Sequence, residues 1–408
     1  MAVETLTFGC RLNTVESEAL RVHAAADGRD RVVVNTCAVT AEAGRQARKA
    51  IRRIARERPD AEIVVTGCGA EVETDAYAAM PEVARLVGNG EKLRPEAWSA
   101  AGTGPGAVMA TRTVEPTRIE AMAGHTRAFV PVQNGCDHRC TFCVIPFGRG
   151  HSRSLPASDV IAQVETIAAH GGREVVLTGV DLTAYGRDLP GPALSLGGLV
   201  RAILRAVPDL ARLRLSSIDS VEADEALLAA VAEEERLMPH LHLSLQAGDD
   251  LILKRMKRRH ARADAIRFCE TVRRLRPGIV LGADLIAGFP TETEAQFARS
   301  LALVAECGLT HLHVFPYSPR PGTPAARMPP VAPDVIRERA ARLRAAGSDA
   351  LRQHLDGQVG RRLTVLAERG GLGRSADFTP VRLATGLAPG TFHTVAIAAH
   401  DGARLIAA

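Results

Sequence analysis

Short runs of valine and isoleucine alternate with stretches of helical periodicity over the N-terminal part of the chain. The pattern predicts three strands, at 3–8, 31–35 and 62–66. Thr40 is placed to cap the helix between the second and third strands. Nearly continuous apolar strands separated by helices are typical of a parallel sheet with both faces covered. At 88–125 this pattern gives way to Gly, Pro, Thr and Ala, which predicts a connector.

A second series of strand and helix units follows the connector. Its predicted strands lie at 128–133, 174–177, 212–215, 240–245, 280–286 and 312–315. The helices between them include one continuous helix at 251–275. Units of this kind at regular spacing predict a (β/α) barrel, complete or partly open.

The character of the sequence changes again near its C-terminal end. Short strands between glycines are predicted at 362–367, 378–383 and 395–399. Together they indicate a small β-barrel. The expected fold class is therefore α/β, with an N-terminal parallel α/β domain, a central (β/α) partial barrel and a C-terminal β-barrel.

Composition narrows the class of protein. The chain has 408 residues, of which 46% are hydrophobic and 24% charged. It holds no apolar run of membrane-spanning length and no N-terminal secretion signal, so we expect a cytoplasmic protein with no membrane partner. Eight cysteines in a chain of this size favour metal or redox chemistry over disulfides, which belong to small secreted domains.

Cys136, Cys140 and Cys143 form a Cys-x3-Cys-x2-Cys loop directly after the first barrel strand. Three thiolates at this spacing can hold one cubane iron–sulfur cluster and leave its fourth iron open. Zinc is the alternative, but a structural zinc site requires four ligands and His138 lies inside the loop. An open iron that binds S-adenosylmethionine (SAM) is the mark of radical SAM enzymes.

Polar or glycine residues end the barrel strands, where chemistry sits in such barrels. We expect Gly179, Ser216 and Gln246 to contact SAM, with Gly179 allowing close backbone approach. The alternative for each is an ordinary polar strand end.

Cys10, Cys37 and Cys68 each follow a predicted strand of the first domain. The carboxyl ends of parallel strands share one crevice, so the three thiols are expected to converge as a second cluster site. Cys269 and Cys307 fall in helices and are predicted to be core residues.

The motifs around these residues resemble the methylthiotransferases, which are radical SAM enzymes that insert sulfur and a methyl group into a C–H bond. The branch acting on threonylcarbamoyladenosine at position 37 of tRNA is the most similar, on the segments 9–18, 35–40, 244–248, 284–290 and 313–324. The resemblance implies a methylthiotransferase domain at 1–105, a radical SAM core at 122–352 and a TRAM-type β-barrel at 353–408.

The same resemblance implies two [4Fe–4S] clusters and SAM as cofactors. The cluster on Cys136, Cys140 and Cys143 would generate a 5′-deoxyadenosyl radical that attacks C2 of the adenine. The cluster on Cys10, Cys37 and Cys68 would deliver sulfur, and a second SAM would supply the methyl group. The implied partners are the tRNA anticodon loop and a flavodoxin- or ferredoxin-like electron donor.

Four alternatives to this function remain open from the sequence. Within the family, the substrate would be isopentenyladenosine 37 of tRNA or an aspartate of a ribosomal protein. Outside it, the chain would be an iron–sulfur electron carrier or a zinc-containing RNA-binding module. Neither of the last two needs two clusters that each have an open iron.

Two basic stretches suit an RNA partner. They lie at 254–276 and 45–58, although a charged run also describes a solvated helix face. The C-terminal barrel is only weakly basic, and its two aromatic residues, Phe378 and Phe392, offer little for base stacking.

Overall fold

The N-terminal domain is built on a parallel sheet. The computed structural model describes residues 3–25, 28–98, 104–117, 122, 124–192 and 194–408. The sheet has the order β1-β2-β3-β4, with strands β1 (Val3–Thr7), β2 (Arg31–Thr36), β3 (Glu62–Gly67) and β4 (Arg85–Leu86). The three predicted strands are confirmed, whereas β4 is too short to have produced a sequence pattern.

Helices cover both faces of this sheet, as predicted. α1 (Arg11–Ala24) packs on Val33 and Val64, and α2 (Ala41–Glu57) packs on Val32 and Val34 of the other face. The Thr40 hydroxyl accepts a hydrogen bond from the Ala43 N–H at 3.2 Å, which confirms the predicted cap. The remaining helices of the domain are short: α3 (Cys68–Val72), α4 (Thr74–Ala78) and the 3-10 helix Pro95–Trp98.

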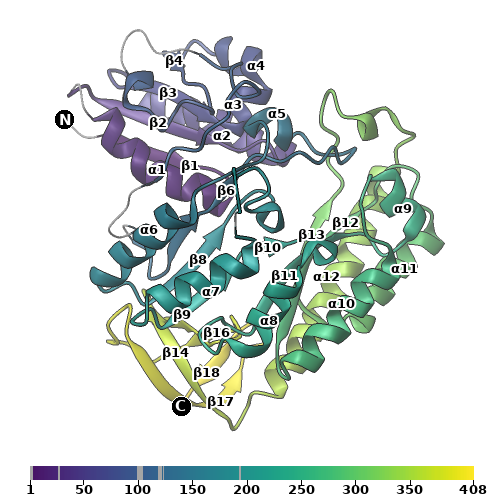
Figure 1. Ribbon diagram of the computed structural model, residues 1–408. Coiled ribbons are helices and arrows are strands. Elements are labelled where there is room, and N and C mark those ends of the chain that lie inside the picture. The colour runs from purple at the N-terminus through teal and green to yellow at the C-terminus, as the bar shows by residue number, and fades with distance from the viewer. Residues whose placement is uncertain (1–2, 26–27, 99–103, 118–121, 123, 193) are drawn as a thin grey trace.

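The central domain is a partial barrel of parallel strands, as expected (Figure 1). One sheet has the order β5-β8-β9, with β5 (Ala128–Pro131), β8 (Glu174–Thr178) and β9 (Arg212–Leu215). The other has the order β10-β11-β12-β13, with β10 (Ser217–Ile218), β11 (His240–Gln246), β12 (Val280–Ala287) and β13 (Leu309–Pro316). Ser216 alone separates β9 from β10, so the six predicted strands form one curved wall with an interruption at this residue.

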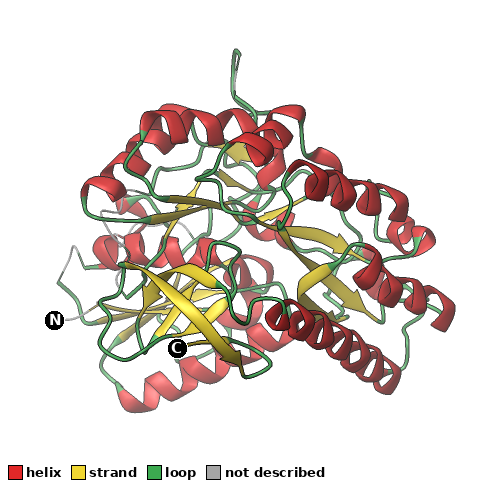
Figure 2. Cartoon of the chain, turned by 90° about the horizontal axis from the view of Figure 1, so that it is seen from below, coloured by secondary structure: helices red, strands yellow, loops and turns green. Residues whose placement is uncertain are grey.

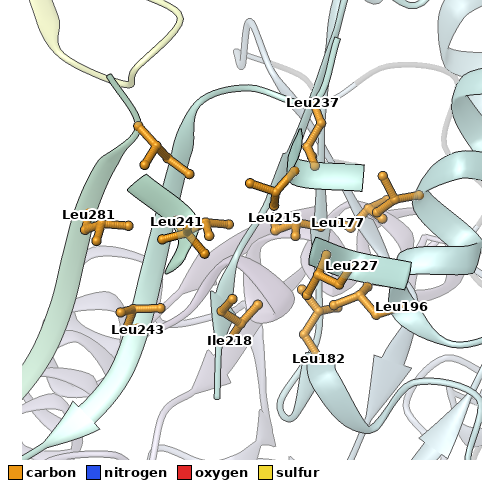
Figure 3. Close-up of a cluster of buried hydrophobic side chains, with 14 of the residues drawn as sticks. Leu177, Leu182, Leu196, Leu215, Ile218, Leu227, Leu237, Leu241, Leu243 and Leu281 are labelled. Carbon is orange, nitrogen blue, oxygen red and sulfur yellow. The ribbon is translucent and has the colours of Figure 1, made fainter. Parts of the chain in front are cut away.

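Helices cover the outer face of this wall. They are α6 (Ala157–Ala169), α7 (Leu196–Ala206), α8 (Glu225–Glu233), α10 (Arg262–Leu275), α11 (Glu294–Glu306) and α12 (Pro333–Asp356). The short helix α5 (Ile145–Arg149) packs instead on α3 of the N-terminal domain, and α9 (Asp250–Arg255) packs on Phe289 beyond the end of β12. Short 3-10 helices occupy Leu182–Ala184, Ser220–Glu222 and Pro324–Arg327. Figure 3 shows leucines of adjacent strands meeting those of α7 and α8 in the core.

The continuous helix predicted at 251–275 is wrong, because α9 and α10 are separate helices. Lys257 adopts a left-handed backbone conformation with φ of 57°, which no α-helix continues through. The turn allows the next residue, Arg258, to point inward and to pair with Asp219.

The C-terminal domain is a closed five-stranded barrel, and Figure 2 views it from below, with its strands in front. Its order is β14-β15-β16-β18-β17, with strands β14 (Arg362–Glu368), β15 (Leu372–Arg374), β16 (Pro380–Arg382), β17 (Phe392–His400) and β18 (Leu405–Ala407). Of these, β15 and β18 were not predicted.

Two arginines of β9 fasten this barrel to the central domain. Arg212 donates hydrogen bonds to the carbonyl oxygens of Arg374 and Thr364, at 3.1 and 2.7 Å. Arg214 donates to those of Ser375 and Ala376, at 2.9 and 2.8 Å. The small barrel thereby closes the end of the central barrel that lies opposite the cysteine loop, at the bottom of Figure 1.

Candidate active site

The predicted radical SAM cysteines lie together on one loop. Cys136, Cys140 and Cys143 occupy the segment between α5 and the strand β6 (Gln133–Asn134), which pairs with β7 (Arg153–Ser154). The backbone N–H groups of His138 and Ile145 donate to the Cys136 and Cys143 sulfurs, each at 3.4 Å. Burial, with the nearby Cys140 thiol, raises the pKa of Cys143 to about 11. Iron binding would remove this penalty by stabilising the thiolates.

A set of buried polar atoms beside this loop lacks partners among the described residues. It comprises Ser216 Oγ, Asp219 Oδ1, Ser220 Oγ and Arg258 Nε. Arg258 joins the set to the loop, because its other nitrogens lie 2.7 Å from Asp219 Oδ2 and 3.8 Å from Cys140 Sγ. Buried polar groups are normally satisfied, so this arrangement fits a polar ligand held next to the cysteines, as SAM would be.

The three residues predicted to contact SAM lie at the carboxyl ends of β8, β9 and β11. Gly179 packs against Gln133, whose Oε1 would lie 3.0 Å from a Cβ at that position. The same oxygen accepts hydrogen bonds from the N–H groups of Val180 and Asp181. Ser216 is buried, and Gln246 is half-buried with a left-handed φ of 69°.

His138 lies beside two acidic side chains. Its Nε2 lies 2.8 Å from Asp181 Oδ2 and 3.6 Å from Glu222 Oε2. Hydrogen bonds to these two carboxylates raise the pKa of His138 to about 9. The ligand atoms of Cys136, His138 and Asp181 lie within 4.8 Å of one another, but this group includes one thiol, whereas a zinc site on the loop would join His138 to all three.

The second predicted triplet also converges. Cys10 precedes α1, Cys37 follows β2 and Cys68 begins α3, all at the carboxyl edge of the N-terminal sheet. Burial, together with the thiols of Cys68 and Cys10, raises the pKa of Cys37 to about 11. Gly9, with φ of +97°, lies against Cys37, since a Cβ on Gly9 would be only 2.6 Å from its sulfur.

Arg149, the last residue of α5, connects the two triplets. Its Nε donates to Cys68 Sγ at 3.1 Å, and its Nη1 pairs with Glu16 of α1 at 2.8 Å. Lys92 also pairs with Glu16, at 2.6 Å. All three charged side chains are at most 2% exposed. A buried arginine beside Cys68 complements the negative charge that thiolates and an iron–sulfur cluster bring.

Sequence reasoning missed Asp219, Arg258 and Arg149. Arg258 lay within a basic stretch in which nothing distinguished it from its neighbours, and Arg149 stood alone. Cys269 and Cys307, in contrast, are fully buried in the central core, as predicted.

The two basic stretches differ in the structure. In the stretch at 254–276, Arg262, Arg273 and Arg276 donate to backbone carbonyl oxygens of neighbouring elements. On α2, five basic side chains are exposed together: Arg45, Lys49, Arg52, Arg53 and Arg56. The two aromatic residues of the C-terminal barrel contact arginines of the other domains, with Arg214 over Phe378 and Arg212 over Phe392.

Comparison with known sequences agrees with this architecture. The sequence model "Radical SAM superfamily" matches residues 130–304, and "Uncharacterized protein family UPF0004" matches residues 2–88. The chain is 46% identical to the threonylcarbamoyladenosine tRNA methylthiotransferase MtaB of Rickettsia prowazekii, over 95% of this chain and 92% of the relative. It is 38% identical to the tRNA-2-methylthio-N(6)-dimethylallyladenosine synthase of Novosphingobium aromaticivorans, over 90% of this chain and 86% of the relative.

Solved structures share the fold at lower identity. The radical SAM methyltransferase TsrM of Kitasatospora setae superposes with a TM-score of 0.55 and 19% identity, over 76% of this chain and 66% of that protein. The chain belongs to the methylthiotransferase family of radical SAM enzymes. No helix within the described part of the chain is long and apolar enough to cross a membrane.

Proposed function

We propose that this enzyme methylthiolates C2 of N6-threonylcarbamoyladenosine at position 37 of tRNA. The observation that carries the proposal is the 46% identity over nearly the whole chain to an enzyme named for that substrate. The identity to a dimethylallyladenosine enzyme is lower, at 38%. The family uses [4Fe–4S] clusters and SAM, and both cysteine triplets fit such clusters.

The chain's own residues divide the work between two sites. Cys136, Cys140 and Cys143 would hold one cluster, and Cys10, Cys37 and Cys68 the other. Gly179, Ser216 and Gln246, with Asp219 and Arg258, would surround SAM. When bound, these cofactors supply the radical, the sulfur and the methyl group of the reaction. The protein would position them and shield the reacting carbon from water.

The three domains are proposed to follow the bounds 1–105, 122–352 and 353–408. We assign tRNA contact to the exposed basic face of α2, because this helix begins next to the carboxyl end of the barrel strand β13. The backbone N–H of Ala41, the first residue of α2, donates a hydrogen bond to Ser318 Oγ, two residues beyond that strand. We further propose that the tRNA docks by its anticodon loop, in the cytoplasm, and that a flavodoxin- or ferredoxin-like protein supplies electrons.

Nucleoside mass spectrometry of tRNA from a deletion strain tests the substrate. We expect the methylthio form of threonylcarbamoyladenosine to disappear and to return with the wild-type gene. Loss of the methylthio isopentenyl nucleoside instead would assign the enzyme to the other branch. If no tRNA nucleoside changed, the proposed function would be refuted, and an aspartate of a ribosomal protein would be the remaining substrate within the family.

Two cysteine variants test the division of labour. After anaerobic reconstitution, Cys140→Ala should abolish 5′-deoxyadenosine production. Cys37→Ala should retain that production and yield no methylthiolated tRNA. Each variant should lose about half of the iron bound by the wild type, because three thiolates hold each cluster. Zinc in place of iron would refute the assignment.

A further inference from the structure

Arg11 lies where the three domains meet. It is the first residue of α1 and directly follows Cys10, and α1 runs along the border of the N-terminal and central domains in Figure 1. Its guanidinium carbon is 5.8 Å from the ring centroid of Phe129 on β5 and 5.9 Å from that of Phe378 in the C-terminal barrel. Arg11 therefore faces the inside of the central barrel, on the side that the outer helices do not cover.

The guanidinium of Arg11 has no hydrogen-bond or carboxylate partner among the described residues. The other arginines around it do: Arg214 pairs with Glu174 at 2.7 Å, and Arg374 with Glu368 at 3.4 Å. Arg127 pairs with both of these acids. A half-buried guanidinium surrounded by other cations is costly unless an anion compensates it.

Asp284 is the acid whose charge reaches Arg11, but it is already engaged. Its Oδ1 lies 2.9 Å from His242 Nε2 and 3.2 Å from His313 Nδ1. The two histidine rings flank the carboxylate from the neighbouring strands β11 and β13. Arg11 is thus left free to bind an anion that enters the barrel from outside.

The substrate of the proposed function carries such an anion. The threonylcarbamoyl group keeps the α-carboxylate of threonine, whereas the dimethylallyl group is uncharged. C2, the reacting carbon, and N6, which bears the substituent, belong to the same adenine base. Arg11 directly follows Cys10, and its guanidinium extends into the barrel toward Phe129 and the charge of Asp284. An adenine whose C2 faces the cluster site at Cys10 would direct its N6 substituent into the same space.

Building on the proposed function, we propose that Arg11 binds the threonyl carboxylate and selects this nucleoside over its uncharged counterparts. A guanidinium matches a carboxylate with two parallel hydrogen bonds. A neutral substituent would leave Arg11 enclosed and unpaired, and a site with an unsatisfied polar group rejects such a substrate strongly.

The test compares two tRNA substrates that differ in this charge. One carries threonylcarbamoyladenosine, and the other carries its cyclic form, in which the carboxylate is consumed in a ring. The reconstituted holoenzyme should prefer the open form in kcat/KM. Arg11→Gln should lower kcat/KM for the open form on the order of 100-fold and change that for the cyclic form little. Arg11→Lys keeps the positive charge but cannot form two parallel hydrogen bonds to a carboxylate. Its kcat/KM for the open form should lie between those of the wild type and Arg11→Gln.

Arg21→Gln is the matched control, since Arg21 lies on the same helix, is exposed and pairs with Glu18. It should leave the ratio of the two kcat/KM values unchanged. Iron content checks that every variant keeps its clusters, and Arg11→Lys provides the comparison if Arg11→Gln loses iron.

Two results would overturn the assignment of Arg11. If Arg11→Gln left the ratio of kcat/KM for the open and cyclic substrates unchanged, Arg11 would not bind the carboxylate. An equal loss for both substrates would show that it binds a phosphate or supports the cluster site. A wild-type enzyme that leaves the open-form tRNA unmodified would instead refute the proposed function itself.

Discussion

The Nε of Arg149 donates a hydrogen bond to the sulfur of Cys68 at 3.1 Å, across the boundary between the central and N-terminal domains. The same guanidinium pairs with Glu16, and solvent barely reaches either group, because both side chains are only 2% exposed. Breaking a buried ion pair by removing one partner is far more costly than breaking a surface pair.

We therefore predict that Arg149→Met destabilises the protein by about 3–5 kcal/mol. The change leaves Glu16 with one cation and Cys68 with no arginine beside it. Thermal and urea unfolding of the anaerobically purified protein measure the effect. Arg45→Met, which removes an exposed pair with Glu42, should cost less than about 1 kcal/mol. Equal effects of the two substitutions would contradict the prediction.

Glu16 should make the fold sensitive to acid. Burial raises the pKa of this carboxyl, but Arg149 and Lys92 outweigh burial and lower it to about 2 from an ordinary 4.5. Between these values the unfolded chain binds a proton that the folded chain does not, so stability falls as the pH drops through this range. The loss amounts to about 3 kcal/mol. Glu16→Gln should show a shallower decline between about pH 5 and pH 2 than the wild type, and an identical decline would refute this account.

Gly9 should be required for the N-terminal cysteine site. A Cβ at this position would lie 2.6 Å from both Cβ and Sγ of Cys37, and the backbone φ of +97° already disfavours any side chain. Gly9→Ala should displace Cys37 and lower the iron content by about half, since one of the two sites loses a ligand. Gly28→Ala is the control, because Gly28 also has a positive φ, +70°, but no atom within 4 Å of the added Cβ. Full iron content in Gly9→Ala would argue against Cys37 as a ligand.

Arg212 should govern how firmly the C-terminal barrel is attached. Arg212→Met removes two charge-assisted hydrogen bonds to backbone carbonyl oxygens and leaves Glu174 paired with Arg214. We expect faster amide hydrogen exchange in β14 and β15 and a loss of about 1.5–3 kcal/mol. Arg173→Met removes an interaction with the ring of Phe392, the one side-chain contact of Arg173 with the described residues of the barrel, and should change exchange little.

The exposed face of α2 should carry part of the tRNA affinity. Replacing Arg52 and Arg56 by glutamate should weaken binding of every tRNA and make its salt dependence shallower, by about one unit of slope for each phosphate that is no longer neutralised. The control replaces Arg267 of α10, which is exposed but pairs with Asp264. A salt dependence that does not change would exclude α2 from the interface.

Most of the longer strands of the two α/β domains were predictable because they are runs of apolar residues, as in β2 and β3, that a parallel sheet buries on both faces. The strands β4, β15 and β18 were missed because two or three residues form no pattern. The break between α9 and α10 was not predictable, since it depends on Arg258 pairing with Asp219, which lies 39 residues earlier in the chain. Arg149 and Glu16 are 133 residues apart in the sequence, so no local sequence pattern predicts that they pair. Cys136, Cys140 and Cys143 could be grouped by their spacing in the sequence, and Cys10, Cys37 and Cys68 because each follows a strand of one parallel sheet. Arg11, in contrast, could be recognised only from the arrangement of three domains.

Helix α5 begins two residues after Cys143 and ends at Arg149, whose side chain contacts Cys68. The stretch from Cys143 to Arg149 thus spans the distance between the two cysteine triplets. Inserting or deleting one residue in α5 would rotate Arg149 by about 100° around the helix axis, away from Cys68. In evolutionary terms, this stretch should accept substitutions far more readily than any change in its length.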